Sequence, residues 1–115
     1  MQQRFPRRWD KITRINFLQR KMIINAILYY ELNDSKLSDK DYDELSKQLV
    51  ELQKDVDISK TQYGYAMYDF DGTTGFDLYS RLKENDRKYL LNISKHILGR
   101  GEKKIVKKAK KGGLF

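Results

Sequence analysis

A long amphipathic stretch near the start of the chain constrains the fold more than any other sequence feature. Between Trp9 and Leu32, apolar residues recur at the three- and four-residue spacing that places side chains on one face of a helix. The stripe consists of Ile12, Ile15, Leu18, Met22, Ala26 and Tyr29, with Ile23, Ile27 and Tyr30 beside it. Because the second half, MIINAILYY, is apolar over a wide arc, we expect other elements to cover it on more than one side. The pattern predicts one long amphipathic helix.

A second helix is predicted directly after a polar interruption at residues 33–36. Ser38 stands three residues before Asp41, an arrangement that resembles a capping box with Asp in the acidic position. The helix is expected to run to about Lys54 and to bury Tyr42, Leu45, Leu49 and Leu52. Because the connection is short, the two helices should form an antiparallel hairpin.

The second half of the chain carries weaker signals. From residue 55 to 75 the alternation of Tyr63, Tyr65 and Met67 with smaller residues predicts irregular or short extended structure. From residue 76 to 98 helical spacing returns; it is broken near Glu84-Asn85, and Asp77 or Ser80 is a candidate cap. Gly99 and Gly101 are expected to end this helix, and His96 then becomes a cation near the helix C-terminus.

These segments predict a mainly α fold with a helical hairpin, one or two C-terminal helices, a tyrosine-rich linker and a basic tail. We expect a single helical domain over residues 1–99, with the hairpin at 9–54, the linker at 55–75 and the C-terminal helices at 76–99. The tail, residues 100–115, has too few apolar residues to build a core, and we expect it to be mobile unless a partner orders it.

The hairpin carries a family resemblance. A Tyr29-Tyr30 pair is followed, after a turn, by Ser38-Asp39-x-x-Tyr42-Asp43-x-Leu45, and residues 48–52 continue the match. This stretch, about a third of the chain, resembles the small N-terminal domain of bacterial NAD-dependent DNA ligases. The family's turn carries Asp and Pro where this chain has Asn33 and Ser35.

The resemblance implies a hairpin that closes over the nicotinamide mononucleotide half of NAD. The residues that correspond to this cofactor-binding role are Tyr29, Tyr30, Asp39, Tyr42 and Asp43. Packing offers an alternative, in which Tyr29 and Tyr42 face each other across the hairpin and the carboxylates meet the helix dipole. Ligation is excluded, because the family's adenylation step needs a lysine two residues before Asp-Gly, and Asp69 occupies that place before Asp71-Gly72.

The distribution of charge points to a polyanionic partner. The chain has 24 Lys and Arg against 16 Asp and Glu, a net charge of +8. Residues 1–24 and 100–115 each carry seven basic side chains against one acidic one, so each end is +6 around a centre of −4. Clustered cations gain affinity for nucleic acid by displacing counterions. The candidate phosphate contacts are Arg4, Arg7, Arg8, Lys11 and Arg14 in the first segment, and Arg100, Lys103, Lys104, Lys107, Lys108, Lys110 and Lys111 in the tail.

We therefore predict a non-catalytic, basic nucleic-acid-binding accessory protein, of a kind found in mobile elements such as phages, built on a ligase-like hairpin. One alternative is a regulator that binds a nucleic-acid enzyme through an acidic hairpin face formed by Asp39, Asp41, Asp43, Glu44 and Glu51. Another is a nicotinamide-nucleotide binding module. An aromatic cluster could also stack on single-stranded bases, or fill the core; it comprises Tyr63, Tyr65, Tyr68, Phe70 and Phe76, with Lys60 and Arg81 nearby.

Several chemistries are disfavoured by what the chain lacks. It has no cysteine and one histidine, so we expect no metal site. We also expect no bound cofactor and no catalytic residue. The segment Asp69-x-Asp71-Gly72-Thr73 resembles the signature of haloacid-dehalogenase-like phosphatases, but that chemistry needs later strands of a parallel sheet, and a turn explains the same residues. With no apolar run of signal-peptide or membrane-spanning length, we expect a cytoplasmic protein without a membrane partner.

Overall fold

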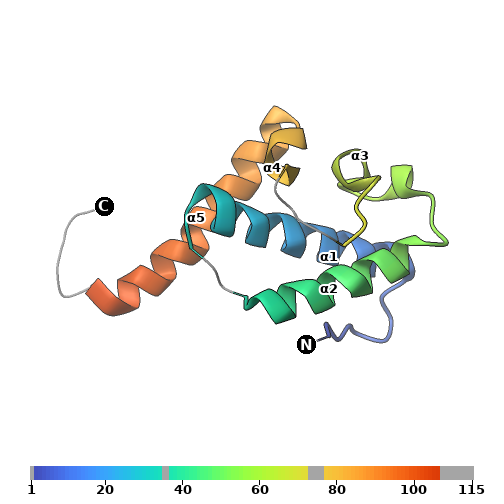
Figure 1. The fold of residues 1–115 in the computed structure, drawn as a ribbon, viewed down its shortest axis with the longest axis horizontal. Coiled ribbons are helices and arrows are strands. Elements are labelled where there is room, and N and C mark those ends of the chain that lie inside the picture. The colour runs from blue at the N-terminus through green and yellow to red at the C-terminus, as the bar shows by residue number, and fades with distance from the viewer. Residues whose placement is uncertain (1, 35–36, 73–76, 107–115) are drawn as a thin grey trace.

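The computed structural model shows a mainly α-helical protein (Figure 1). It describes residues 2–34, 37–72 and 77–106, and no strand occurs in these ranges. The elements are α1 (Lys11–Ala26), η1 (Ile27–Glu31), α2 (Asp39–Gln53), η2 (Ile58–Lys60), α3 (Gly64–Met67), α4 (Leu78–Arg81) and α5 (Glu84–Val106). The predicted fold class is confirmed.

The long first helix forms as predicted, with a cap at its start and a wider turn at its end. The Asp10 carboxylate accepts a hydrogen bond from the Thr13 amide at 2.8 Å and so caps α1. Its stripe is buried at Ile15, Leu18 and Met22. The last turn, η1, is a π-helix, in which the Leu32 amide donates to the Ile27 carbonyl five residues earlier at 3.0 Å.

The second helix and the hairpin are also confirmed. The Ser38 hydroxyl accepts from the Asp41 amide at 3.1 Å and caps α2. In Figure 1, α2 runs back alongside α1. Leu45 and Leu49 are fully buried between the helices, whereas Tyr42 and Leu52 are partly buried at the edge.

The described part of the tyrosine-rich linker is largely irregular, as predicted, but it contains two short helical segments where short extended structure was the alternative. It forms η2 and α3, and Tyr63 and Met67, which stand four residues apart, are both buried. Three residues in alternation satisfy an extended pattern, but the four-residue spacing of Tyr63 and Met67 also fits one helical turn. We call residues 58–72 and 77–83 the corner.

A buried amide in α1 holds the corner against the hairpin. Gln19 donates from Nε2 to Gln53 Oε1 and to Thr61 Oγ1, both at 3.0 Å, and its Oε1 accepts from the Tyr63 amide at 3.0 Å. The backbone at Gly64 lies so close to η2 that an added Cβ would be 1.9 Å from the Ile58 carbonyl oxygen. These contacts explain why this segment turns here, and they depend on residues distant in the sequence.

The predicted break in the C-terminal helical region is confirmed, but the predicted end is wrong. Leu82 takes an extended conformation with ψ of 143° between α4 and α5. Helix α5 then continues through Gly99 and Gly101 to Val106, which leaves His96 exposed within the helix instead of near its end. A glycine inside a helix costs only about 1 kcal/mol, and helix-forming residues follow both glycines. The expected mobile tail falls mostly on residues 107–115, outside the described ranges.

Helix α5 packs on α1 and η1 through Leu90 and Ser94, which are fully buried. Ile97 and Leu98 are partly buried, and Figure 1 shows the helix then extending past the end of the hairpin. Within the described ranges, no helix is long and apolar enough to span a membrane.

Candidate nucleic-acid interface

The N-terminal segment, residues 2–10, is an ordered arm that lies on the hairpin. Phe5, Trp9 and Phe17 of α1 form an aromatic cluster in which the three pairs of ring centroids are 5.8–6.0 Å apart. The Phe5 and Phe17 rings meet edge to face, the geometry that aromatic quadrupoles favour. The cluster therefore fixes both ends of the arginine-containing stretch 4–8.

Polar contacts anchor the arm to α2. The Gln3 amide donates to Gln48 Oε1 at 2.9 Å, and Gln48 Nε2 donates back to the Gln3 carbonyl at 3.0 Å. Gln3 Oε1 also accepts from Lys21 Nζ at 2.7 Å. The Lys21 ammonium group therefore makes an intramolecular hydrogen bond that helps to anchor the arm.

Arg14 of α1 anchors the arm by hydrogen bonds to its backbone carbonyls. Its Nε donates to the Trp9 carbonyl at 3.1 Å, and one terminal nitrogen lies 3.4 Å from the carbonyls of both Pro6 and Arg7. The guanidinium also sits 5.4 Å from the centre of the Phe5 ring. Arg14, one of the predicted phosphate contacts, therefore already uses its donors within the molecule.

The other cations of the arm point to solvent. Arg4, Arg7 and Arg8 are exposed, and within the described part of the chain none of them makes an ion pair. Lys11, which begins α1, forms a long surface ion pair with Asp55 at 3.7 Å. Within the described ranges, the anchored arm therefore carries three exposed arginines that make no ion pair.

The last turns of α5 lie at the other end of the molecule from the arm. Arg100, Lys103 and Lys104 belong to the last turns of α5, whereas Lys107, Lys108, Lys110 and Lys111 lie beyond the described residues. Figure 1 shows α5 ending on the left, away from the arm, which joins α1 on the right. The described end of α5 is therefore not brought next to the arm.

The residues that correspond to a nicotinamide site gather at the mouth of the hairpin. Tyr29 and Tyr30 lie on η1, both exposed, with their rings edge to face at 4.8 Å. Burial, and to a lesser extent the nearby Tyr30, raise the pKa of Tyr42 to about 12, and its hydroxyl has no hydrogen-bond partner among the described residues. Asp39 and Asp43 are exposed on α2. Tyr29 is 54% exposed, and its packing against Tyr42 stays a prediction.

The acidic hairpin face is partly neutralised by its own helix. Asp43 pairs with Lys47 and Glu51 with Lys54, each at 3.1 Å. Asp39 and Asp41 lie in the first turn of α2, where negative charge favours the helix dipole. These carboxylates therefore have structural roles, and recognition of a protein through this face stays a prediction.

The aromatic cluster of the linker divides between core and surface. Tyr63 is buried and cannot stack on a base, whereas Tyr68 is 66% exposed beneath the Arg81 guanidinium, 5.6 Å from its ring centre. The Tyr65 hydroxyl donates to Asp86 and accepts from the Lys83 amide at 3.2 Å, so it caps the start of α5. Phe70 is partly buried, and Phe76 lies outside the described ranges.

The phosphatase-like segment serves as a turn. Asp69 accepts hydrogen bonds from both terminal nitrogens of Arg81, which hold the pKa of this carboxyl below its usual value. Gly72 has a φ of +87°, as the turn interpretation requires. In the parts of the chain that are described, no group of three or more metal-ligating side chains occurs.

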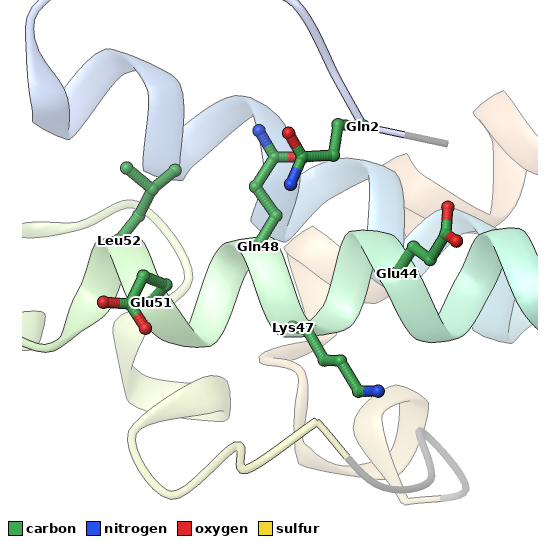
Figure 2. A pocket seen from close by; sticks show the side chains of 6 residues that line it. All are labelled: Gln2, Glu44, Lys47, Gln48, Glu51 and Leu52. Carbon is green, nitrogen blue, oxygen red and sulfur yellow. The ribbon is translucent and has the colours of Figure 1, made fainter.

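A groove between the arm and α2 was missed by the sequence analysis. It has a volume of about 450 Å³ and is lined by Gln2, Glu44, Lys47, Gln48, Glu51 and Leu52. Figure 2 shows the Gln48 side chain rising from α2 toward Gln2. No pattern in the sequence marks it, because it exists only where the arm docks.

Neither a family model, nor a curated protein, nor a solved structure matches this chain.

Proposed function

We propose that the protein is a non-catalytic nucleic-acid-binding protein that contacts phosphates through the arginines of its arm. The observation that carries this proposal is the contrast between the cations of α1 that anchor the arm and the arginines on the arm itself. Arg14 and Lys21 are engaged in anchoring contacts, whereas Arg4, Arg7 and Arg8 are exposed and unpaired on the backbone that those contacts hold. An anchored arm loses less conformational entropy on binding than a free tail.

The chemistry of this surface favours backbone contacts over sequence readout. Guanidinium groups bind phosphate oxygens through two parallel hydrogen bonds, and clustered ones release counterions. The ligase-like hairpin then acts as the scaffold that positions the arm.

The test is binding of a fluorescent DNA duplex, and of its single strand, across a salt series. Changing Arg4, Arg7 and Arg8 together to Gln should weaken binding at least tenfold and lower the salt slope by two to three, at about one per phosphate contact. The matched control changes three exposed lysines, Lys40, Lys88 and Lys95, to Gln and removes the same charge. Equal losses in the two variants would show that only net charge matters, and no binding at low salt would refute the proposal.

A second candidate function, nicotinamide-nucleotide binding, is favoured by the exposed Tyr29 and Tyr30 pair beside Asp39 and Asp43. Exposed tyrosine rings can stack on a cationic pyridinium ring. Nicotinamide mononucleotide should then raise the melting temperature, and Tyr29→Ala, at a side chain outside the core, should abolish the rise. A melting temperature that does not respond to the nucleotide excludes this candidate.

A further inference from the structure

Resting on the proposed function, we infer that Gln48 of α2 is a positioning residue for phosphate binding, which holds Arg4 in place through the backbone of Gln3. Both polar atoms of its side-chain amide bond to this one arm residue. Gln48 Oε1 accepts from the Gln3 amide at 2.9 Å, and Gln48 Nε2 donates to the Gln3 carbonyl at 3.0 Å. Because hydrogen bonds are directional, two of them to the same backbone fix its orientation as well as its place.

Gln3 transmits this restraint to Arg4. The Gln3 side chain donates from Nε2 to the Arg4 carbonyl at 2.9 Å, and its Oε1 accepts from Lys21 Nζ at 2.7 Å. The peptide unit between Gln3 and Arg4 is planar, so the carbonyl that Gln48 fixes also sets the plane of the Arg4 amide. Arg4 is exposed and forms no ion pair among the described residues. Its backbone is therefore fixed while its guanidinium group faces solvent.

A separate set of contacts holds Arg7 and Arg8. The Trp9 amide donates to the Pro6 carbonyl at 3.1 Å and closes a turn that has these two arginines at its central positions. Arg14 of α1 bonds carbonyls of the same turn. Helix α2 supplies none of these contacts, so loss of the α2 contact should affect the first arginine of the arm and spare the other two.

The restraint on Arg4 matters because ordering a flexible residue costs free energy when a ligand binds. A backbone that is already fixed has lost this entropy before the phosphate arrives. Without the Gln48 hydrogen bonds, only the fraction of molecules in which the start of the arm stays docked presents all three guanidinium groups together. The affinity for a duplex should fall by the factor by which that fraction falls.

The experiment is a double-mutant cycle in the full chain, measured by binding of a fluorescent DNA duplex at low salt. Gln48→Met keeps the side-chain length and the net charge but removes both hydrogen bonds, and should weaken binding about three- to tenfold. In an Arg4→Gln background the same change should have no further effect, whereas in an Arg7→Gln background it should keep its full effect. Gln62→Met, at an exposed side chain of the corner, is the matched control and should leave the affinity unchanged.

The outcomes separate this inference from the proposed function. If the intact protein does not bind the duplex at low salt, both fail. If the change of Arg4, Arg7 and Arg8 to Gln weakens binding but Gln48→Met does not, the positioning role is overturned and the proposed function stands. A loss in Gln48→Met that is equal in the Arg4→Gln and Arg7→Gln backgrounds, or that Gln62→Met reproduces, also overturns the positioning role, because general destabilisation would then explain it. The same holds if Arg4→Gln alone leaves the affinity unchanged.

Discussion

The arm and the corner both cover the α1–α2 hairpin, but different contacts hold them there. The fully buried amide of Gln19 fixes the corner to the hairpin. Within the corner, Arg81 ties the two segments together through Asp69, Asp77 and the Ala66 carbonyl. The arm is held by partly buried rings and by the reciprocal amide pair of Gln3 and Gln48. Buried polar groups cost more to leave unpaired than surface ones do. We therefore expect the corner to unfold with the core, and the arm to detach before the core unfolds.

The largest effect should follow from adding one carbon to the corner. In Gly64→Ala the new Cβ would lie 1.9 Å from the Ile58 carbonyl oxygen and 2.6 Å from Thr61 Oγ1, so η2 or α3 must move. We expect a loss of about 2–4 kcal/mol in the free energy of unfolding, measured in urea. The matched control is Gly99→Ala, where nothing lies within 4 Å of the new carbon. That change should stabilise α5 by up to about 1 kcal/mol, and similar losses in both variants would contradict the argument.

The next effect tests the buried amide. Gln19→Leu keeps most of the side-chain volume but leaves Gln53, Thr61 and the Tyr63 amide without this partner. We expect a loss of about 2–3 kcal/mol and faster hydrogen exchange at the Tyr63 amide. Gln62→Leu, at an exposed side chain in the same segment, is the control and should stay within about 0.5 kcal/mol. A small loss of unfolding free energy in Gln19→Leu would contradict this, because the corner would then be held no more firmly than the arm.

A milder effect is expected when the arm loses its aromatic anchor. Trp9→Ala removes the ring that contacts both Phe5 and Phe17, and we expect a loss of about 1–2 kcal/mol. The sharper readout is local, because trypsin cleaves after arginine and should attack the bonds that follow Arg7 and Arg8 several-fold faster once the arm detaches. Trp9→Phe keeps an aromatic ring and should cleave nearly as slowly as the unaltered chain. Global unfolding of Trp9→Ala would show that the arm is part of the core.

The same contrast explains which features the sequence predicted. The hairpin followed from the periodicity of α1 and the Ser38 cap, because both signals act within a few residues. The helical corner did not, because it depends on Gln19 meeting a segment more than 40 residues away. The anchoring role of Arg14 was also missed, since its partners are carbonyls that carry no sequence signature. The positions of the cations were visible, but their sorting into anchoring and exposed groups needed the fold.

The smallest expected effect is a change in the pH dependence of stability through the ion pair of Asp69 and Arg81 in the corner. Hydrogen bonds from Arg81 are the main cause that lowers the pKa of Asp69 below its ordinary value of 3.8. A carboxyl whose pKa is lower in the folded state stabilises the protein above its unfolded pKa, and this contribution is lost as the pH falls through the folded value. Stability should therefore decline as the pH falls below about 4, the ordinary pKa of an aspartate. Asp69→Asn should remove part of that decline, measured by urea unfolding across the pH series.

A double-mutant cycle assigns this pH dependence to the pair. Asp10 and Asp57 also have lowered pKa values, because each caps a helical turn through hydrogen bonds from Thr13 and Ser59, so some decline must remain in Asp69→Asn. If the ion pair is the cause, Arg81→Gln should flatten the acid decline by the same amount, and adding Asp69→Asn to it should change the slope no further. Additive changes in slope would mean that Asp69 is stabilised by groups other than Arg81. Trypsin cleavage at the arm should be equal in all four proteins, since none of these residues contacts it.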